Sequence, residues 1–389
     1  MPTIDFTDTK VAFEYKSDRE LKQAYRLFKL LSYPALVNAG AVFAPLFVNM
    51  GGKALIKKTL YRQFVGGETR EESLNIIQLL AQYKVSSILD YSVEGEQSEE
   101  SFEHCKREII KNIEFSKDKP YIPFCVFKPT GMARFALLEK VSAGKELIPA
   151  EKDEWARAKN RVMEVCQKAY EHCQPIFIDA EESWIQAAID DMADECMQTF
   201  NSSECIVYNT YQLYRTDRLQ FLKDSCAKAR ENKYYLGAKL VRGAYMEKER
   251  ERALKMGYPS PIHPDKSATD KAYNDALTFC VENLDIISVC AGTHNEESSQ
   301  LLVDLMEQYK INKSDRRIFF SQLLGMSDHI SFNLAKEGYN VVKYVPYGPV
   351  KSVLPYLIRR AQENTSVKGQ TGRELSLIMQ ELKRRHYGT

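Results

Sequence analysis

Hydrophobic and polar positions follow a helical period in the first part of the chain. Leu21, Phe28 and Leu31 recur at steps of seven and three positions, which places them on one face of a helix. Ser17 and Asp18 precede this run, and both residue types favour a helix start because their side chains accept hydrogen bonds from its free N–H groups. We predict an N-terminal helical region over 1–82, with its other helices at 51–64 and 69–83.

Beyond residue 82 the pattern changes to short apolar runs separated by helix-length amphipathic stretches. The runs are brief and rich in β-branched residues, as buried strands are. Eight strands are predicted, at 85–91, 121–128, 175–180, 205–211, 235–241, 286–292, 317–323 and 340–345. Strands that alternate with helices pair in parallel through right-handed crossovers.

This order of elements indicates the α/β class and, within it, a (β/α)8 barrel of the TIM type preceded by the helical region. A doubly wound open sheet is the alternative, but such a sheet usually has a Gly-rich turn after its first strand. The segment after the first predicted strand, SVEGEQSEE, has no G-x-G-x-x-G pattern. We therefore expect three regions, namely the N-terminal helices at 1–82, the barrel at 83–370 and an amphipathic helix at 371–389.

Composition and charge narrow the function further. The 54 Lys and Arg nearly balance the 53 Asp and Glu, so no overall positive field favours nucleic acid. The histidines form no H-x-x-x-H pair and the cysteines no C-x-x-C pair, so we expect no metal site and free thiols in a reducing compartment. The first residues lack a leader pattern, and the apolar stretch 34–50 is too short and broken to span a bilayer. We expect a cytoplasmic protein, with peripheral contact to the inner face of a membrane left open.

Polar side chains gather at the carboxyl ends of the predicted strands. Barrel enzymes build their ligand sites from these ends, because all eight open onto one face of the barrel. One polar strand end means little, whereas eight together indicate a site lined from all sides. The residues are Asp90, Glu94, Lys128, Asp179, Glu181, Glu182, Asn209, Tyr211, Gln212, Lys239, Arg242, Thr293, His294, Asn295, Gln322, Lys343, Tyr344 and Tyr347.

Two adjacent arginines follow the last predicted strand, in the segment YLIRRAQEN. On a helix Arg359 and Arg360 point about 100° apart and can hold one ligand from two sides. Guanidinium groups match carboxylates and phosphates in shape and charge. A solvated helix face with an Arg359–Glu363 pair is the alternative interpretation.

The segment GAKLVRGAY, at 237–245, combines cations with a glycine turn. It begins as a strand that carries Lys239 and Arg242, and Gly243 and Ala244 then allow backbone to approach a ligand closely. Exposed N–H groups beside a cation suit a pyrophosphate. The alternative is an ordinary strand-to-helix turn. GTHN, at 292–295, is a similar strand end.

Several of these segments together resemble the proline dehydrogenase family, especially its eukaryote-like monofunctional branch. They are IDAEE, YNTYQ, GAKLVRGAYMEKERERA, GTHN, SQLLGMSDHISFNLAKEGYNVVKYVPYGPV and YLIRRAQEN. The resemblance covers roughly residues 80–370 and implies a flavoenzyme with a distorted (β/α)8 barrel that binds FAD noncovalently. It implies oxidation of L-proline to Δ1-pyrroline-5-carboxylate by hydride transfer to flavin N5, with electrons passed to a membrane quinone, as the first step of proline degradation to glutamate. Hydroxyproline dehydrogenase, of the same family, is the alternative.

The resemblance also implies roles for single residues at the substrate. Arg359 and Arg360 would bind the proline carboxylate, and Lys128 would complete the cationic pocket. Asp179 and Glu363 would compensate the charge. Further residues implied around the substrate are Tyr344 and Tyr356, as walls of the proline ring, and Glu94, as a partner for an arginine of the last helix. Lys128, Asp179 and Lys239 are the catalytic residues that the resemblance implies.

For the cofactor, the resemblance implies contacts from the ends of the fourth, fifth and sixth strands and from Lys266. The residues are Asn209, Lys239, Val241, Arg242, Gly243, Ala244, Lys266, Thr293, His294 and Asn295. Two of them depart from the bifunctional bacterial members. Lys239 stands where those members have an arginine near flavin N5. A lysine ammonium lacks the forked arrangement of donors that a guanidinium has. Asn209 stands where we expect them to have a glutamine.

The chain has no room for the second catalytic domain of the bifunctional members, so we expect a separate pyrroline-5-carboxylate dehydrogenase to take its product. A quinone acceptor implies peripheral membrane contact, through the basic helix around 375–385 and the apolar stretch 34–50; a helix packed on the barrel is the alternative for 375–385. Two other function classes stay open from the residues alone. They are a barrel enzyme that acts on a phosphorylated substrate and a binding module without catalysis.

Overall fold

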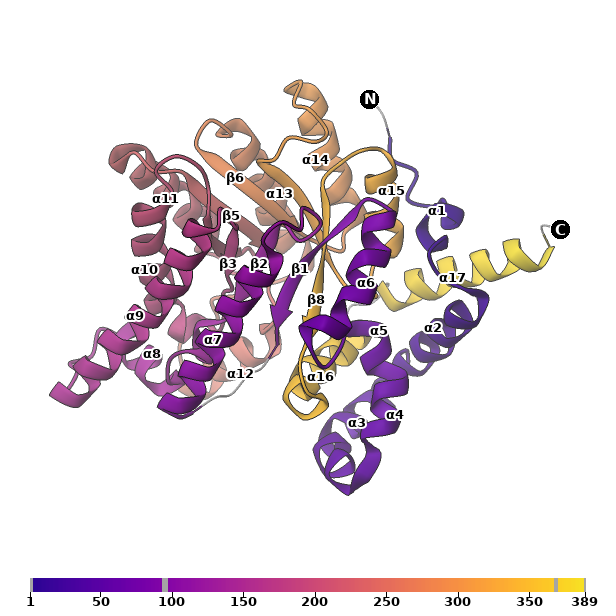
Figure 1. Cartoon of the computed structure of the whole chain (residues 1–389), viewed down its shortest axis with the longest axis horizontal. Helices are drawn as coiled ribbons and strands as arrows, with labels where there is room; N and C mark the ends of the chain where they lie inside the picture. The colour runs from indigo at the N-terminus through magenta and orange to yellow at the C-terminus, as the bar shows by residue number, and fades with distance from the viewer. Residues whose placement is uncertain (1–2, 93–96, 367–369, 388–389) are drawn as a thin grey trace. The chain divides into compact units, whose positions relative to one another are not determined.

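Eight strands form a closed barrel in the computed structural model, which describes residues 3–92, 97–366 and 370–387 (Figure 1). The strand order around the barrel follows the chain from β1 to β8. The strands are β1 (Val85–Tyr91), β2 (Phe124–Phe127), β3 (Ile176–Ile178), β4 (Val207–Gln212), β5 (Leu236–Val241), β6 (Ile287–Gly292), β7 (Ile318–Leu323) and β8 (Val341–Tyr347). The predicted α/β barrel after N-terminal helices is confirmed, and each predicted run overlaps one strand, although β4 and β8 extend one and two residues beyond their predicted ends.

By packing, the chain divides into two compact units. Among the described residues, the first unit covers 97–321 and the second covers 3–92 and 322–387. We call the first the barrel unit, because it holds β2 to β6 and most of β7. We call the second the terminal unit, because it holds both ends of the chain with β1 and β8, which pair in parallel over their whole length.

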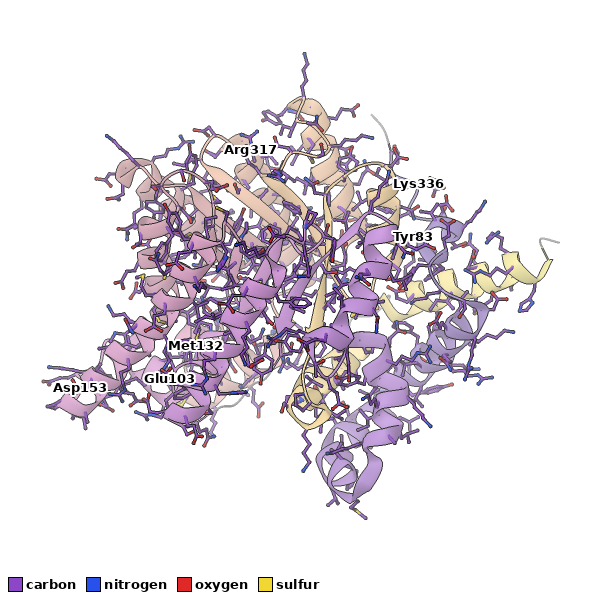
Figure 2. The ribbon with its side chains drawn as sticks, in the orientation of Figure 1. Tyr83, Glu103, Met132, Asp153, Arg317 and Lys336 are labelled. Carbon is purple, nitrogen blue, oxygen red and sulfur yellow. The ribbon has the colours of Figure 1, made fainter. Side chains whose placement is uncertain are left out.

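Helices cover the outside of the strands in the barrel unit (Figure 1). They are α7 (Glu99–Ser116), η3 (Pro129–Gly131), α8 (Phe135–Ser142), α9 (Pro149–Glu171), α10 (Ser183–Phe200), α11 (Arg218–Asn232), α12 (Met246–Met256), α13 (Lys266–Glu282) and α14 (Glu296–Gln308). Arg161 of α9 joins this layer together: its guanidinium bonds Glu103 of α7 at 2.7 Å and the carbonyl of Met132 at 2.9 Å. Figure 2 labels both partners.

Aromatic rings fill one end of the barrel interior. Phe124 of β2 stacks on Phe177 of β3 with ring centroids 4.4 Å apart, and it meets Phe319 of β7 edge-on at 4.8 Å. Strands β2 and β7 are not neighbours, so these rings can touch only across the interior. Because side chains alternate along a strand, the inward face of β3 also carries Asp179. By register and ring contact, Tyr208 is inward on β4.

The terminal unit is mostly helical. Its helices are α1 (Thr9–Phe13), α2 (Asp18–Leu31), α3 (Pro34–Phe47), η1 (Val48–Gly52), α4 (Lys53–Ile56), η2 (Lys57–Tyr61), α5 (Arg62–Phe64), α6 (Arg70–Gln82), α15 (Asp328–Lys336), α16 (Val350–Ser366) and α17 (Gln370–Tyr387). Ser17 caps α2, and Glu20 returns a hydrogen bond to its backbone. The predicted helix at 51–64 begins only at Lys53, because Gly51 has a φ of 99° and interrupts the helix. Helix α3 was not predicted.

The apolar stripe of α17 is used in packing. Leu377 and Ile378 are buried in one hydrophobic cluster with Phe28 of α2 and Leu357 of α16. The guanidinium of Arg385 also donates to the carbonyl of Phe13 at 2.8 Å. Of the two interpretations of this helix, its apolar side chains therefore support the packed one, although its partners are helices of the terminal unit.

A buried cluster of charges joins three segments of the terminal unit. The carboxylate of Asp328 accepts hydrogen bonds or ion pairs from the Lys343 ammonium at 2.9 Å, the Lys16 ammonium at 2.9 Å and the Tyr15 hydroxyl at 2.7 Å. Lys343 also donates to the carbonyl of Met326 at 2.8 Å. Burial by itself raises the pKa of Asp328, but the charges of Lys16 and Lys343 outweigh it and hold this pKa well below its ordinary value. The cluster is stable because each buried charge has a partner.

We expect Asp328→Asn to destabilise the terminal unit by about 3–5 kcal/mol, because it leaves the fully buried Lys343 without its counter-charge. Urea unfolding at pH 7 measures the loss. The matched control is Asp275→Asn on α13, whose ion pair with Lys271 is exposed and contributes less than about 0.5 kcal/mol. The stabilisation by Asp328 is present above its unfolded pKa and is lost as the pH falls below about 4. Equal losses in the two variants would contradict this account.

Candidate functional site

Three residues predicted to be catalytic come together in the barrel unit. The ammonium of Lys128, which follows β2, lies 2.7 Å from the carboxylate of Asp179, which follows β3. The other oxygen of Asp179 pairs with the ammonium of Lys239 on β5. Asp179 and Lys239 are buried, and the Lys239 ammonium also lies 5.5 Å from the centre of the Phe177 ring. Because Phe177 faces the barrel interior, this contact places the Lys239 side chain on the inward face of β5.

The charge state of Asp179 follows from its two partners. Burial raises the pKa of this carboxyl, but the positive charges of Lys128 and Lys239 outweigh burial and hold the pKa at about 2. Asp179 is therefore ionised at neutral pH and cannot act there as a proton donor. It can balance two cations and fix where their ammonium groups lie.

A second buried carboxyl, Glu181, holds the turn that follows β2. It accepts the backbone N–H of Thr130 at 3.0 Å and the Thr130 hydroxyl at 2.6 Å. The same turn carries Lys128, two residues earlier. Burial raises the pKa of Glu181 to about 7, against the lowering effect of the two Thr130 hydrogen bonds. Glu181 therefore changes charge near neutral pH, unlike Asp179.

We expect the raised pKa of Glu181 to appear in the pH dependence of stability. Its protonated form is favoured in the fold, so its stabilisation is complete below pH 4.5 and is lost as the pH rises through about 7, by roughly 3 kcal/mol in total. Glu181→Gln stays neutral and should remove this slope. The measurement is the thermal midpoint between pH 4 and 8.

Glu307→Gln, at an exposed position of α14, is the control and should keep the slope of the parent protein. A Glu181→Gln variant with an unchanged slope would show that another group titrates in this range.

Three of the predicted cofactor residues form a hydrogen-bonded set at the ends of β5 and β6. The guanidinium of Arg242 donates to the hydroxyl of Thr293 at 2.7 Å and to that of Ser298 at 2.9 Å. Asn295 caps α14 by accepting the N–H of Ser298 at 2.8 Å. Arg242 also lies 4.4 Å from the centre of the Tyr273 ring. A cation, a hydroxyl and a helix N-terminus together make a group of donors that suits an anion.

Asp270 links two of the predicted cations. One of its oxygens accepts the Arg242 guanidinium at 2.7 Å, and the other pairs with the ammonium of Lys266. Lys266 is the first residue of α13 and its side chain is mostly exposed. Sequence reasoning missed Asp270, although its position four residues after Lys266, the spacing of neighbours on one helix face, was a usable signal.

The structure explains why the second glycine of the GAKLVRGAY segment, Gly243, is a glycine. Gly243 has a φ of 138°, and a Cβ at this position would lie 2.5 Å from the ring of Tyr214. The need for glycine therefore comes from backbone conformation and from Tyr214. Around it, Val241 and His294 are half-buried and Ala244 is exposed.

Asn209 lies on the other face of β4 from the ring of Tyr208. Its amide N–H2 donates to Asp190 of α10 at 3.0 Å, and Asp190 also accepts Arg218 of α11 at 2.6 Å. The alternation that places Tyr208 inward places Gln212 inward as well. Its amide donates to the carbonyl of Glu181 at 2.6 Å. A contact between Asn209 and a cofactor stays a prediction.

The remaining predicted residues lie in the terminal unit. Arg360 is buried, with its guanidinium 5.2 Å from the centre of the Tyr356 ring one turn earlier on α16. Arg359 is half-buried, and Tyr356 belongs to the hydrophobic cluster of this unit. Tyr344 of β8 is buried and aligned with Ile88 of β1. Glu94 and the side chain of Glu363 lie outside the described residues.

Known proteins match this chain over most of its length. The family model described as proline dehydrogenase matches residues 73–373. The chain is 32% identical to proline dehydrogenase 1, mitochondrial, of Dictyostelium discoideum, over 97% of this chain and 74% of that protein. It is 31% identical to hydroxyproline dehydrogenase of Xenopus laevis, over 98% of this chain and 90% of that protein.

Among solved structures, proline utilization A from Bdellovibrio bacteriovorus shares the fold, with a TM-score of 0.74 at 20% identity. The match covers 95% of this chain and 40% of that one, so the chain spans about two fifths of its length. Within the described residues, no helix is long and apolar enough to cross a membrane.

Proposed function

Because the chain belongs to the proline dehydrogenase family of oxidoreductases, we propose that it oxidises L-proline to Δ1-pyrroline-5-carboxylate with bound FAD. The observation that carries the proposal is the ion-paired set of Lys128, Asp179 and Lys239 toward the carboxyl ends of three strands, with Asp179 and Lys239 buried. Barrel enzymes place their reacting groups at these ends. The relatives include a proline dehydrogenase and a hydroxyproline dehydrogenase, so 4-hydroxyproline is the second candidate substrate.

The donors at the ends of β5 and β6 fit a flavin dinucleotide. Lys239, Arg242, Thr293 and the N-terminus of α14 offer cations, a hydroxyl and backbone N–H groups, which are the partners that a pyrophosphate and a flavin ring edge require. The chemistry that FAD supplies when bound is the acceptance of two electrons. On β4, the alternation of side chains favours Gln212 over Asn209 as the residue that faces this cofactor.

The residues of the chain would act by charge and position. Lys239 would place a positive charge beside the electron-accepting part of the cofactor, where it stabilises negative charge as it develops. Asp179, ionised at neutral pH, would hold Lys239 and Lys128 in place and lower the net charge of the pair. Glu181 would keep the turn with Lys128 in position through Thr130.

Arg359 and Arg360 would bind the carboxylate of proline, with Lys128 as a further cation, as the family resemblance implies. The buried position of Arg360 supports this role, because a partly desolvated guanidinium binds a carboxylate more strongly than an exposed one. Tyr344 and Tyr356 would contact the proline ring.

Electrons would leave to a membrane quinone, and the product would pass to a separate pyrroline-5-carboxylate dehydrogenase. Both partners are proposed from the family resemblance. A peripheral position at a membrane would bring the enzyme to such an acceptor.

The first test is the absorbance spectrum of the purified protein. We expect about one FAD per chain, released by denaturation, and loss of the oxidised-flavin absorbance when L-proline is added without oxygen. A parallel addition of trans-4-hydroxy-L-proline, compared by kcat/KM with a dye acceptor, separates the two candidate substrates. Protein that cannot be loaded with FAD, or loaded protein that neither imino acid reduces, would reject the proposal.

The second test concerns the arginine pair. Arg360→Ala should weaken proline binding by about 2–4 kcal/mol, because a charge-assisted hydrogen bond is lost, while FAD content is kept. The control is Lys351→Ala, which removes an exposed cation from the same helix. The measurement is the concentration of proline that half-saturates anaerobic flavin reduction. If the parent, Arg360→Ala and Arg359→Ala proteins gave the same value, the two arginines would not bind proline and the solvated helix face would be the better interpretation.

A further inference from the structure

Charge is distributed unevenly along the chain, and one segment is strongly basic. Residues 21–67 contain seven Lys and Arg and no Asp or Glu. The rest of the chain then carries 47 Lys and Arg against 53 Asp and Glu. Within the segment, residues 30–52 contain no charged side chain at all. An uncharged stretch between basic flanks is typical of segments that lie at the surface of an anionic membrane.

The same segment exposes large apolar side chains. Seven of them are more than half exposed, namely Leu30, Tyr33, Leu36, Phe43, Leu46, Met50 and Leu55. Elsewhere in the described chain, only Ile148, Leu254 and Met256 reach this exposure among large apolar side chains. Single exposed apolar residues are ordinary on a soluble protein, but a concentration of this kind marks an interaction surface.

One face of helix α3 and its neighbours packs against the rest of the terminal unit. Val37, Val48 and Ile56 are buried in the hydrophobic cluster of the terminal unit. The exposed side chains of Leu36, Phe43 and the others therefore form the remaining side of a folded segment, which Figure 1 shows as α3 and α4 in indigo and violet. An outer face of a helix is normally polar, and here it is apolar.

Lysines stand at both ends of this apolar surface. Lys29 lies near the end of α2, and Lys53 and Lys58 lie in α4 and η2. Two other cations of the segment have acidic partners from outside it: Lys57 pairs with Glu68 and Arg62 with Glu20. On α2, Arg19, Lys22 and Arg26 line one hollow of the surface. These positions suit contacts with phosphate groups around an apolar insertion.

We propose that the surface formed by residues 30–55, with its flanking lysines, docks on an anionic phospholipid leaflet. Helix α3 has 14 residues, a length of about 21 Å, which is short of the hydrocarbon thickness of about 30 Å. It would therefore lie along the interface, with Phe43, Leu46 and Met50 among the acyl chains and the lysines at the headgroups. A second copy of the chain is a poorer occupant, because it would bring two basic segments together.

The proposal deepens the proposed function, because a quinone acceptor lies in the same bilayer. Its test does not depend on catalysis. We would measure co-sedimentation of the whole chain with vesicles of phosphatidylcholine mixed with the anionic lipid phosphatidylglycerol, and with vesicles of phosphatidylcholine alone. Anionic vesicles should bind the protein at least tenfold more tightly, and added salt should weaken the binding.

Two double variants locate the surface. Phe43→Glu with Met50→Glu places acidic groups on the proposed surface and should reduce binding to anionic vesicles at least tenfold. Leu254→Glu with Met256→Glu makes the same change on α12, where the side chains are equally exposed, and should leave binding within twofold of the parent. Proline oxidation with a soluble dye as electron acceptor should be unchanged in both, which keeps this test separate from that of the proposed function.

Three outcomes would overturn the proposal. The first is a parent protein that does not sediment with anionic vesicles. The second is equal binding by the two double variants. The third is a Phe43→Glu, Met50→Glu protein that binds vesicles like the parent but changes from an oligomer to a monomer in light scattering, which would assign the surface to a second copy of the chain.

Discussion

The ion set of Lys128, Asp179 and Lys239 is the interaction on which the candidate site depends. Three strands deliver these groups to the barrel interior, where an unpaired charge would be strongly destabilising. One carboxylate between two ammonium groups satisfies the electrostatics and leaves a net positive charge. That surplus is available to an anionic substrate or to negative charge that develops on a cofactor. The low pKa of Asp179 keeps the arrangement in one charge state over the physiological range.

The terminal unit contains a similar set, a carboxylate between two lysines, but this set stabilises the fold. Asp328 is also a buried carboxylate between two lysines, but its set includes Tyr15 and a strand residue, Lys343, and so joins segments that are far apart in the chain. The difference lies in what surrounds each set. In the barrel unit the neighbours are polar strand ends, whereas in the terminal unit they are backbone carbonyls and packed helices. The same pair of residue types can therefore serve a reaction or the stability of a fold.

The two segments expected at a membrane, 34–50 and 375–385, differ in whether their apolar side chains are exposed. The stripe of α17 is apolar and its flank is basic, but Leu377 and Ile378 are buried in the core of the terminal unit, and Leu375 and Leu382 pack against it. Helix α3 has no charge and no sequence cap that we recognised, yet Leu36, Phe43 and Leu46 remain exposed on it. Apolar periodicity alone could not separate these cases, because a stripe that packs on protein and one that packs on lipid have the same spacing.

The sequence by itself determined the element order and hence the barrel, because eight short apolar runs separated by helical stretches leave few alternatives. Through the family resemblance, it also pointed to Lys128, Asp179 and Lys239 as one group. Only the tertiary structure decided which face of β4 carries Asn209 and which carries Gln212, since a shift of one residue inverts a strand. It likewise decided that Lys343 pairs with Asp328 and that Gly243 makes room for Tyr214. Such contacts join residues distant in the chain, and no local pattern encodes them.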